Sequence, residues 1–211
     1  ASALQHSPHD ADAWHYQGVL QHLCGQHEDA QRSIRHAIHL LETSADASPM
    51  WNNLGNVCLE TGALPEAARA YQACLKLAPE RSGTWVNLCT TLRAQGDMAG
   101  ATDAARRATE ANADDAEAWY ALSRVLIEAG QVHEGLVAHS HAVMHWPRHA
   151  LARDQVLRAM SLLGLKNEAA ALYRQWLDEE PDNPVAQHQW AANADVEPPA
   201  RASDGYLQEV F

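Results

Sequence analysis

Residues 51–79 read WNNLGNVCLETGALPEAARAYQACLKLAP, and this stretch decides the fold. Small and apolar residues recur at the i, i+3, i+4, i+7 spacing of one helix face: Trp51, Leu54, Gly55 and Cys58. A second stripe with helical spacing follows: Ala67, Tyr71 and Cys74. Gly62 lies between the two stripes, where glycine commonly ends a helix. Pro79 follows the second stripe and cannot continue a helix, because it lacks the backbone N–H. The stretch therefore predicts two helices joined by a short turn.

The same pattern recurs along the chain. Tryptophans stand at positions 14, 51, 85 and 119, which are 37, 34 and 34 residues apart. Aligned on this period, repeats begin at positions 11, 48, 82, 116 and 150. Glycines stand at the same position of all five aligned repeats: Gly25, Gly62, Gly96, Gly130 and Gly164. Small residues at repeat positions 8 and 20, such as Gly55 and Ala67, let the two helices of a repeat approach closely. The sequence therefore predicts five helical hairpins that stack on one another.

This repeat resembles the tetratricopeptide repeat (TPR). The resemblance implies an all-α fold, a right-handed superhelix (α-solenoid) of about five hairpins. The fifth repeat departs from the pattern, with Arg153 in place of tryptophan and Leu157 at a position that is usually small. A final helix over residues 184–194, anchored by Trp190, is predicted to cap the last repeat. The predicted organisation is an extension over 1–10, the repeat array over 11–195, and a linker over 196–211 that begins a possible further domain.

The composition excludes some classes of function. The chain has 211 residues, with 15 basic and 27 acidic side chains and a net charge of −12, which argues against nucleic-acid binding. No stretch approaches the roughly 20 apolar residues of a membrane span. The first ten residues also lack the basic and apolar segments of a signal peptide. These observations predict a soluble, cytoplasmic protein without membrane or nucleic-acid partners.

Four cysteines are present without a CxxC pair: Cys24, Cys58, Cys74 and Cys89. We interpret them as small buried hydrophobes inside helices, in a reduced compartment. Disulfides or a metal site are the alternative.

The resemblance implies that the first helices of the hairpins line a concave groove, which would bind a protein or peptide. The predicted groove residues are Tyr16, Asn52, Asn53, Asn56, Asn87, Arg93, Tyr120, Arg124, Gln155 and Arg158. Asn53 and Asn87 are similar to the asparagines of the TPR region of O-linked N-acetylglucosamine transferases, whose amides bind a peptide backbone. An amide can do this irrespective of sequence, because it carries both donors and an acceptor. The alternative is that both asparagines are ordinary solvated residues.

Three of these groove residues are arginines: Arg93, Arg124 and Arg158. A basic track would suit a carboxylate or an acidic peptide, because guanidinium groups bind such anions in a bidentate way. The alternative is that Arg124 and Arg158 pair with nearby acidic side chains: Glu117, Glu128 or Asp154. The lysine that chaperone-tail clamps of this family carry at repeat position 5 is absent.

No metal site, cofactor or catalytic site is predicted. His141 and His145 are four residues apart on one helix and could chelate an ion, but no third ligand completes the set. His139 stands at a position that is normally aromatic and is expected in the core. The chain also lacks a nucleophile motif, a pair of catalytic carboxylates and a phosphate-binding loop. We therefore predict that the chain is not itself an enzyme.

Residues 196–203 read VEPPARAS, a linker, and residues 204–211 read DGYLQEVF. The residues from position 201 onward resemble the junction in bacterial proteins where TPR repeats precede an S-adenosylmethionine-dependent methyltransferase domain. The alternative is a disordered linker and a terminal helix that packs on the array. Three functions are therefore considered: a peptide-binding scaffold, the recruiting module of a larger methyltransferase or glycosyltransferase, and an oligomerisation module that forms homo-oligomers.

Overall fold

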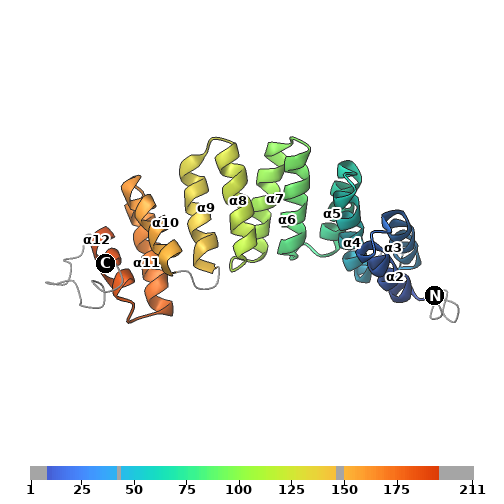
Figure 1. The fold of residues 1–211 in the computed structure, drawn as a ribbon, viewed down its shortest axis with the longest axis horizontal. Coiled ribbons are helices and arrows are strands. Elements are labelled where there is room, and N and C mark those ends of the chain that lie inside the picture. The colour runs from blue at the N-terminus through green and yellow to red at the C-terminus, as the bar shows by residue number, and fades with distance from the viewer. Residues whose placement is uncertain (1–8, 42–43, 146–149, 195–211) are drawn as a thin grey trace. The chain divides into compact units, whose positions relative to one another are not determined.

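The computed structural model describes residues 9–41, 44–145 and 150–194. These residues form eleven α-helices and one short 3₁₀ helix, and they contain no strand (Figure 1). The all-α prediction is confirmed. No helix within the described ranges has the length and apolar character needed to cross a membrane. The predicted linker over 196–211 and nearly all of the extension over 1–10 lie outside the described residues.

The helices follow one another as hairpins. Their bounds are α2 (Ala11–Leu23), α3 (His27–Leu41), α4 (Ser48–Glu60), α5 (Leu64–Leu77), α6 (Ser82–Ala94), α7 (Met98–Ala111), α8 (Ala116–Glu128), α9 (Val132–His145), α10 (Ala150–Leu162), α11 (Lys166–Glu179) and α12 (Pro184–Asn193). The 3₁₀ helix η1 (Ala45–Ala47) precedes α4 and accommodates the longer first interval between tryptophans. The first helices of the five hairpins begin at the residues where the sequence period begins.

The turns within the hairpins depend on glycine. The backbone φ is positive at all five glycines of the repeat phase, from 73° at Gly25 to 87° at Gly164. Side chains with a Cβ rarely adopt this left-handed conformation. At Gly62 the backbone N–H donates to the carbonyl of Leu59 at 3.0 Å, which satisfies an acceptor at the end of α4. Local sequence therefore determines where each first helix ends.

The chain divides into two compact units, Ala1–Ala113 and Asp114–Phe211. In the first unit, Figure 1 shows α2 to α7 as three successive hairpins. The first helices α2, α4 and α6 contact one another in sequence order. The second unit contains the hairpins α8/α9 and α10/α11 and the final helix α12. Its core is built on Trp176, Tyr173, Met160, Leu157 and Met144.

The hairpins pack closely where the sequence pattern requires small residues. A Cβ added at Gly55 would lie 2.5 Å from Cε1 of the buried Tyr71 ring. A Cβ at Gly18 would lie equally close to Cγ1 of Ile34. The absence of a side chain at these positions therefore permits α2 to lie against α3, and α4 against α5.

Two expectations about burial need correction. Cys24 is exposed and follows the last residue of α2, because it belongs to the turn before Gly25 rather than to the buried face of the helix. The other three cysteines are buried, and burial raises the pKa of the Cys58 and Cys74 thiols. His139 is only partly buried and lies 6.0 Å from Tyr120 between ring centroids, so it is not a core residue.

Candidate functional site

Amide side chains connect the first helices of the first unit. Asn53 on α4 donates through Nδ2 to Nε2 of His15 on α2, at 2.8 Å. Because an amide nitrogen only donates, Nε2 must accept, so His15 is neutral and carries its proton on Nδ1. Burial lowers the pKa of His15 and favours this neutral form, although the Asp12 carboxylate opposes the shift. Sequence reasoning missed His15, because its role depends on a partner 38 residues away.

A second amide contact joins α4 to α6. Asn87 donates through Nδ2 to Oδ1 of Asn56 at 3.2 Å. The hydroxyl of Tyr71 on α5 donates to the same oxygen at 2.8 Å, and Tyr71 is fully buried. Asn56 is thereby held by two donors. The described residues use neither the Oδ1 nor the second N–H of Asn87 in a side-chain hydrogen bond. This amide can therefore still accept from and donate to a bound backbone.

Asn52 also takes part in a contact between α4 and α6. Thr84 on α6 donates its hydroxyl proton to Oδ1 of Asn52 at 2.9 Å. The Sγ of Cys74 lies 3.8 Å from the Thr84 oxygen and is the donor there, because the hydroxyl proton is already used. Asn52 is half-buried and Thr84 is buried. This asparagine therefore links α4 to α6.

Six of the predicted residues lie on the first helices of this unit. Asn52 and Arg93 are two of them, and the other four form one group: Tyr16, Asn53, Asn56 and Asn87. The Tyr16 side chain is 66% exposed, and its ring stacks on His15 with 5.7 Å between centroids. The three asparagines are half-buried. We call this group, together with His15, the amide surface. Arg93 is half-buried in the last turn of α6.

The second unit contains the remaining predicted residues. The Arg124 guanidinium lies 5.8 Å from the Tyr120 ring centroid, and both side chains are exposed. Arg158 Nε donates to Oδ2 of Asp154 at 2.6 Å, and the Tyr173 hydroxyl donates to the other oxygen at 3.1 Å. The pairing of Arg158 with Asp154, the alternative to a basic track, is thus present. Gln155 belongs to α10, but its side chain lies outside the described part of the structure.

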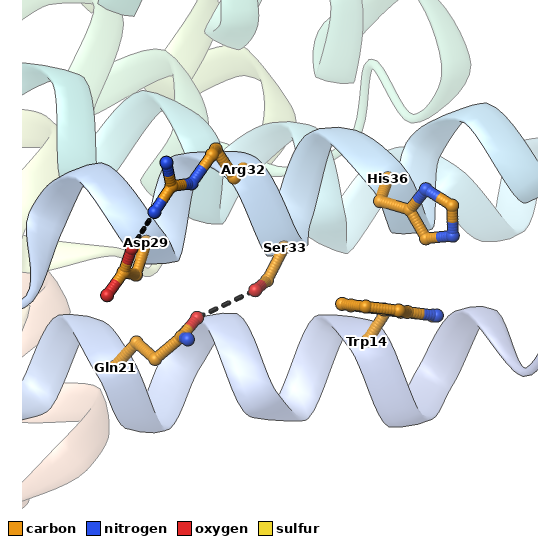
Figure 2. A pocket seen from close by; sticks show the side chains of 6 residues that line it. All are labelled: Trp14, Gln21, Asp29, Arg32, Ser33 and His36. Atoms are coloured by element: carbon orange, nitrogen blue, oxygen red, sulfur yellow. Dashed lines mark hydrogen bonds and ion pairs between the residues drawn. The ribbon is translucent and has the colours of Figure 1, made fainter. Parts of the chain in front are cut away.

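A pocket of about 320 Å³ lies between α2 and α3 (Figure 2). Trp14 faces His36 across it, with 4.5 Å between ring centroids. Further along, Ser33 donates to Oε1 of Gln21 at 2.7 Å, and Arg32 pairs with Asp29. The repeat pattern indicated Trp14 as a packing residue and did not predict this pocket.

Comparisons with known proteins agree with this architecture. Two family models described as tetratricopeptide repeat match residues 25–82 and 58–125. The structure of YrrB, described as a TPR protein with an unusual peptide-binding site, superposes with a TM-score of 0.60 at 22% identity, covering 89% of this chain and 95% of YrrB. A structure of MamA superposes with a TM-score of 0.62 at 18% identity, covering 68% of this chain and 82% of MamA.

A curated human protein, cilia- and flagella-associated protein 70, is 24% identical over 132 residues. That match covers 63% of this chain and only 12% of the human protein. The solved structures show the α-solenoid fold, and the two family models identify the repeat. Residues 25–125, which the two family models match, are therefore tetratricopeptide repeats.

Proposed function

We propose that the chain is a protein-interaction scaffold and that the amide surface of its first unit binds an extended peptide segment. The observation that carries this proposal is the row of hydrogen-bonded amides on consecutive first helices, with Asn53 linked to α2 and Asn87 linked to α4. The intramolecular bonds fix the orientation of each amide before a ligand arrives. A pre-ordered amide loses little conformational freedom on binding, which favours affinity.

The chemistry of the surface suits a main chain better than a particular side chain. Asn87 keeps an acceptor and a donor, and an extended peptide presents alternating carbonyl and N–H groups. Tyr16 adds an exposed aromatic ring at the α2 end of the same surface. Arg93 is proposed to add charge to this surface where a ligand is acidic. Arg124 and Arg158 belong to the second unit and are proposed to add charge for an acidic ligand bound there. In this proposal the chain has no chemistry of its own, and the peptide-binding site described for YrrB supports the assignment.

The recruiting and oligomerisation roles stay predictions of the sequence. The residues that suggested a following transferase domain lie outside the described ranges. The match to a much longer human protein is consistent with repeats of this kind occurring inside larger chains.

A binding titration tests the amide surface. Linear peptides selected from a phage-displayed library against the full chain are titrated calorimetrically into the parent and into the N53A/N87A variant. Neutral hydrogen bonds contribute about 0.5–1.5 kcal/mol each, so we expect affinity to fall roughly 5- to 150-fold in the double variant. This loss should be nearly independent of salt, whereas a contribution from the arginines should shrink as ionic strength rises.

Q72A is the matched control, because Gln72 is an exposed amide on the second helix α5. It should bind as the parent does. Thermal unfolding of N53A/N87A shows whether the variant stays folded, since it also loses the bond to His15. Parental affinity in a folded N53A/N87A variant would contradict the proposal.

A further inference from the structure

Three potential metal ligands converge at one end of the first two hairpins. His22 lies in the last turn of α2, His27 is the first residue of α3, and Glu60 is the last residue of α4. Nδ1 of His22 lies 3.3 Å from Nδ1 of His27, and Nε2 of His22 lies 3.1 Å from Oε2 of Glu60. One potential ligand atom from each residue can be chosen so that all three lie within 4.8 Å of one another. We propose that these three side chains form a binding site for a divalent transition-metal ion, with zinc as the expected occupant.

The distances suit this ion. Zinc binds histidine nitrogen at about 2.0–2.1 Å in a tetrahedral arrangement, which places two nitrogen ligands about 3.3–3.4 Å apart. The two Nδ1 atoms already have this separation. The His22 side chain is 22% exposed and the Glu60 side chain 59% exposed. Glu60 can therefore rotate to complete the set without disturbing the core.

The chemistry of the donors points the same way. Two imidazoles and a carboxylate are a set that zinc uses in proteins where a fourth position is left for water or another ligand. Imidazole also binds copper and nickel, whereas calcium and magnesium prefer sites made of oxygen atoms. The expected occupant is therefore a metal ion of intermediate hardness, such as zinc, that is held mainly by nitrogen ligands.

The backbone holds both histidines in place before a metal arrives. They flank the turn at Gly25, whose N–H donates to the His22 carbonyl at 2.9 Å and whose φ is 73°. The Gln26 N–H donates to the Gln21 carbonyl at 2.8 Å, which closes the same turn. Binding would thus require little reordering of the main chain. An ion held there would also join the first hairpin to α4 of the second.

This site goes beyond peptide binding, and the repeat pattern did not predict it. His22 and His27 are five residues apart across a turn, and Glu60 belongs to the next repeat. None of the three stands in a known spacing motif for metal ligands. They come together only because successive hairpins pack side by side.

The test uses the full chain, stripped with a chelator and then titrated with Zn²⁺ by calorimetry. We expect one ion per chain at this site, and affinity for it reduced by about tenfold or more in H22A, in H27A and in E60Q. E60Q keeps the size of Glu60 but removes its charge. Cobalt substitution gives a second readout, because tetrahedral Co²⁺ absorbs visible light and the band should disappear in H22A.

Two control variants separate this site from adventitious binding. C24S removes an exposed thiol two residues from His22, and H133A removes an exposed histidine on α9. Both should bind zinc at this site as the parent does. Zinc should also raise the melting temperature of the parent but not that of H22A/H27A, since only the parent has the ligands for an ion that adds a further link between the two hairpins.

Either of two results would overturn the proposal. One is that H22A, H27A and E60Q titrate as the parent does, which would place the zinc elsewhere. The other is that the parent binds no zinc, which would leave the three side chains as a hydrogen-bonded cluster without a metal. The melting temperatures of the parent and H22A in the presence of chelator measure the contribution of the metal-free contacts separately, because H22A loses those contacts whether or not metal binds.

Discussion

At the residue scale, the stability of each hairpin depends on how closely its two helices approach. Gly55 on α4 faces the ring of Tyr71 on α5, and Tyr71 is fully buried. The Tyr71 hydroxyl is fixed by its bond to Asn56, and burial raises its pKa well above the ordinary value. The ring therefore cannot move aside without breaking a hydrogen bond.

Two glycine variants test this packing. We expect G55A to lower the free energy of unfolding by about 1–3 kcal/mol, because the added methyl overlaps the Tyr71 ring. G83A should have the opposite effect and stabilise by up to about 1 kcal/mol, because no heavy atom lies within 4 Å of the added Cβ and alanine favours a helix. Urea denaturation of the two variants measures both changes. If the free energy of unfolding changed in the same direction in both variants, the contact with Tyr71 would not explain the change in G55A.

At the element scale, one buried arginine joins three helices of the second unit. Arg153 on α10 is 8% exposed. Its Nη1 donates to Oε2 of Glu179 on α11 at 2.8 Å, and its Nη2 donates to the carbonyl of Met144 in the last turn of α9. The guanidinium also lies 5.8 Å from the centroid of the Trp176 ring. Arg153 thus supplies a donor at a helix end, where carbonyls lack an intrahelical partner.

This arrangement predicts the effect of removing the charge. We expect R153M to destabilise the chain by about 1–3 kcal/mol, because methionine fills the space but leaves the Met144 carbonyl without its donor. E179Q should cost less than about 1 kcal/mol, since Glu179 is 43% exposed and remains solvated. Chemical denaturation followed by circular dichroism compares the two. If R153M is as stable as the parent, the guanidinium contributes no net stability, as occurs at some buried ion pairs replaced by apolar residues.

At the scale of the whole molecule, both units contain a histidine that burial keeps neutral. In the first unit this is His15 on α2. In the second it is His141 on α9, whose ring stacks on Trp119 with 4.3 Å between centroids. Burial lowers the pKa of His141, and His145 lowers it further. Acid should therefore destabilise both units in the same way, by protonating a histidine whose burial favours the neutral form.

The direction of the pH effect follows from these lowered pKa values. Unfolded histidine takes up a proton near pH 6.5, whereas the folded chain does so at His15 and His141 only at lower pH. Below about pH 6.5 the unfolded state therefore binds more protons, so the free energy of unfolding falls as the pH drops below that value and levels off once His15 and His141 are also protonated in the folded chain. Protonation of His15 also places two donors face to face at Asn53.

Urea denaturation at pH 7.5 and pH 5 measures this effect. We expect the H15Q/H141F variant to lose less stability than the parent between the two pH values. Glutamine can still accept from Asn53, and phenylalanine can still stack on Trp119. H39Q, at an exposed position on α3, is the control for the loss of a histidine. An equal loss in H15Q/H141F and the parent would place the acid sensitivity in other groups.

The sequence by itself determined the helical repeat and its turns. Residues such as Trp51 and Leu54 follow the helical period, and the glycines mark the sites of positive φ, because both signals depend on local backbone geometry. The first helices accordingly begin where the period begins, and α12 forms where a capping helix was predicted. The sequence also named the asparagines of the amide surface, although their function stays a proposal.

Only the tertiary structure decided which side chains meet. Asn53 forms a hydrogen bond with His15, 38 residues away, and Asn87 forms one with Asn56, 31 residues away. The burial of Arg153 and the convergence of His22 with Glu60 depend in the same way on neighbouring hairpins. The physical reason is that a period reports which face of a helix is buried, whereas a hydrogen bond requires two atoms about 3 Å apart with the correct orientation. That distance is set by the packing of successive repeats, which no single repeat encodes.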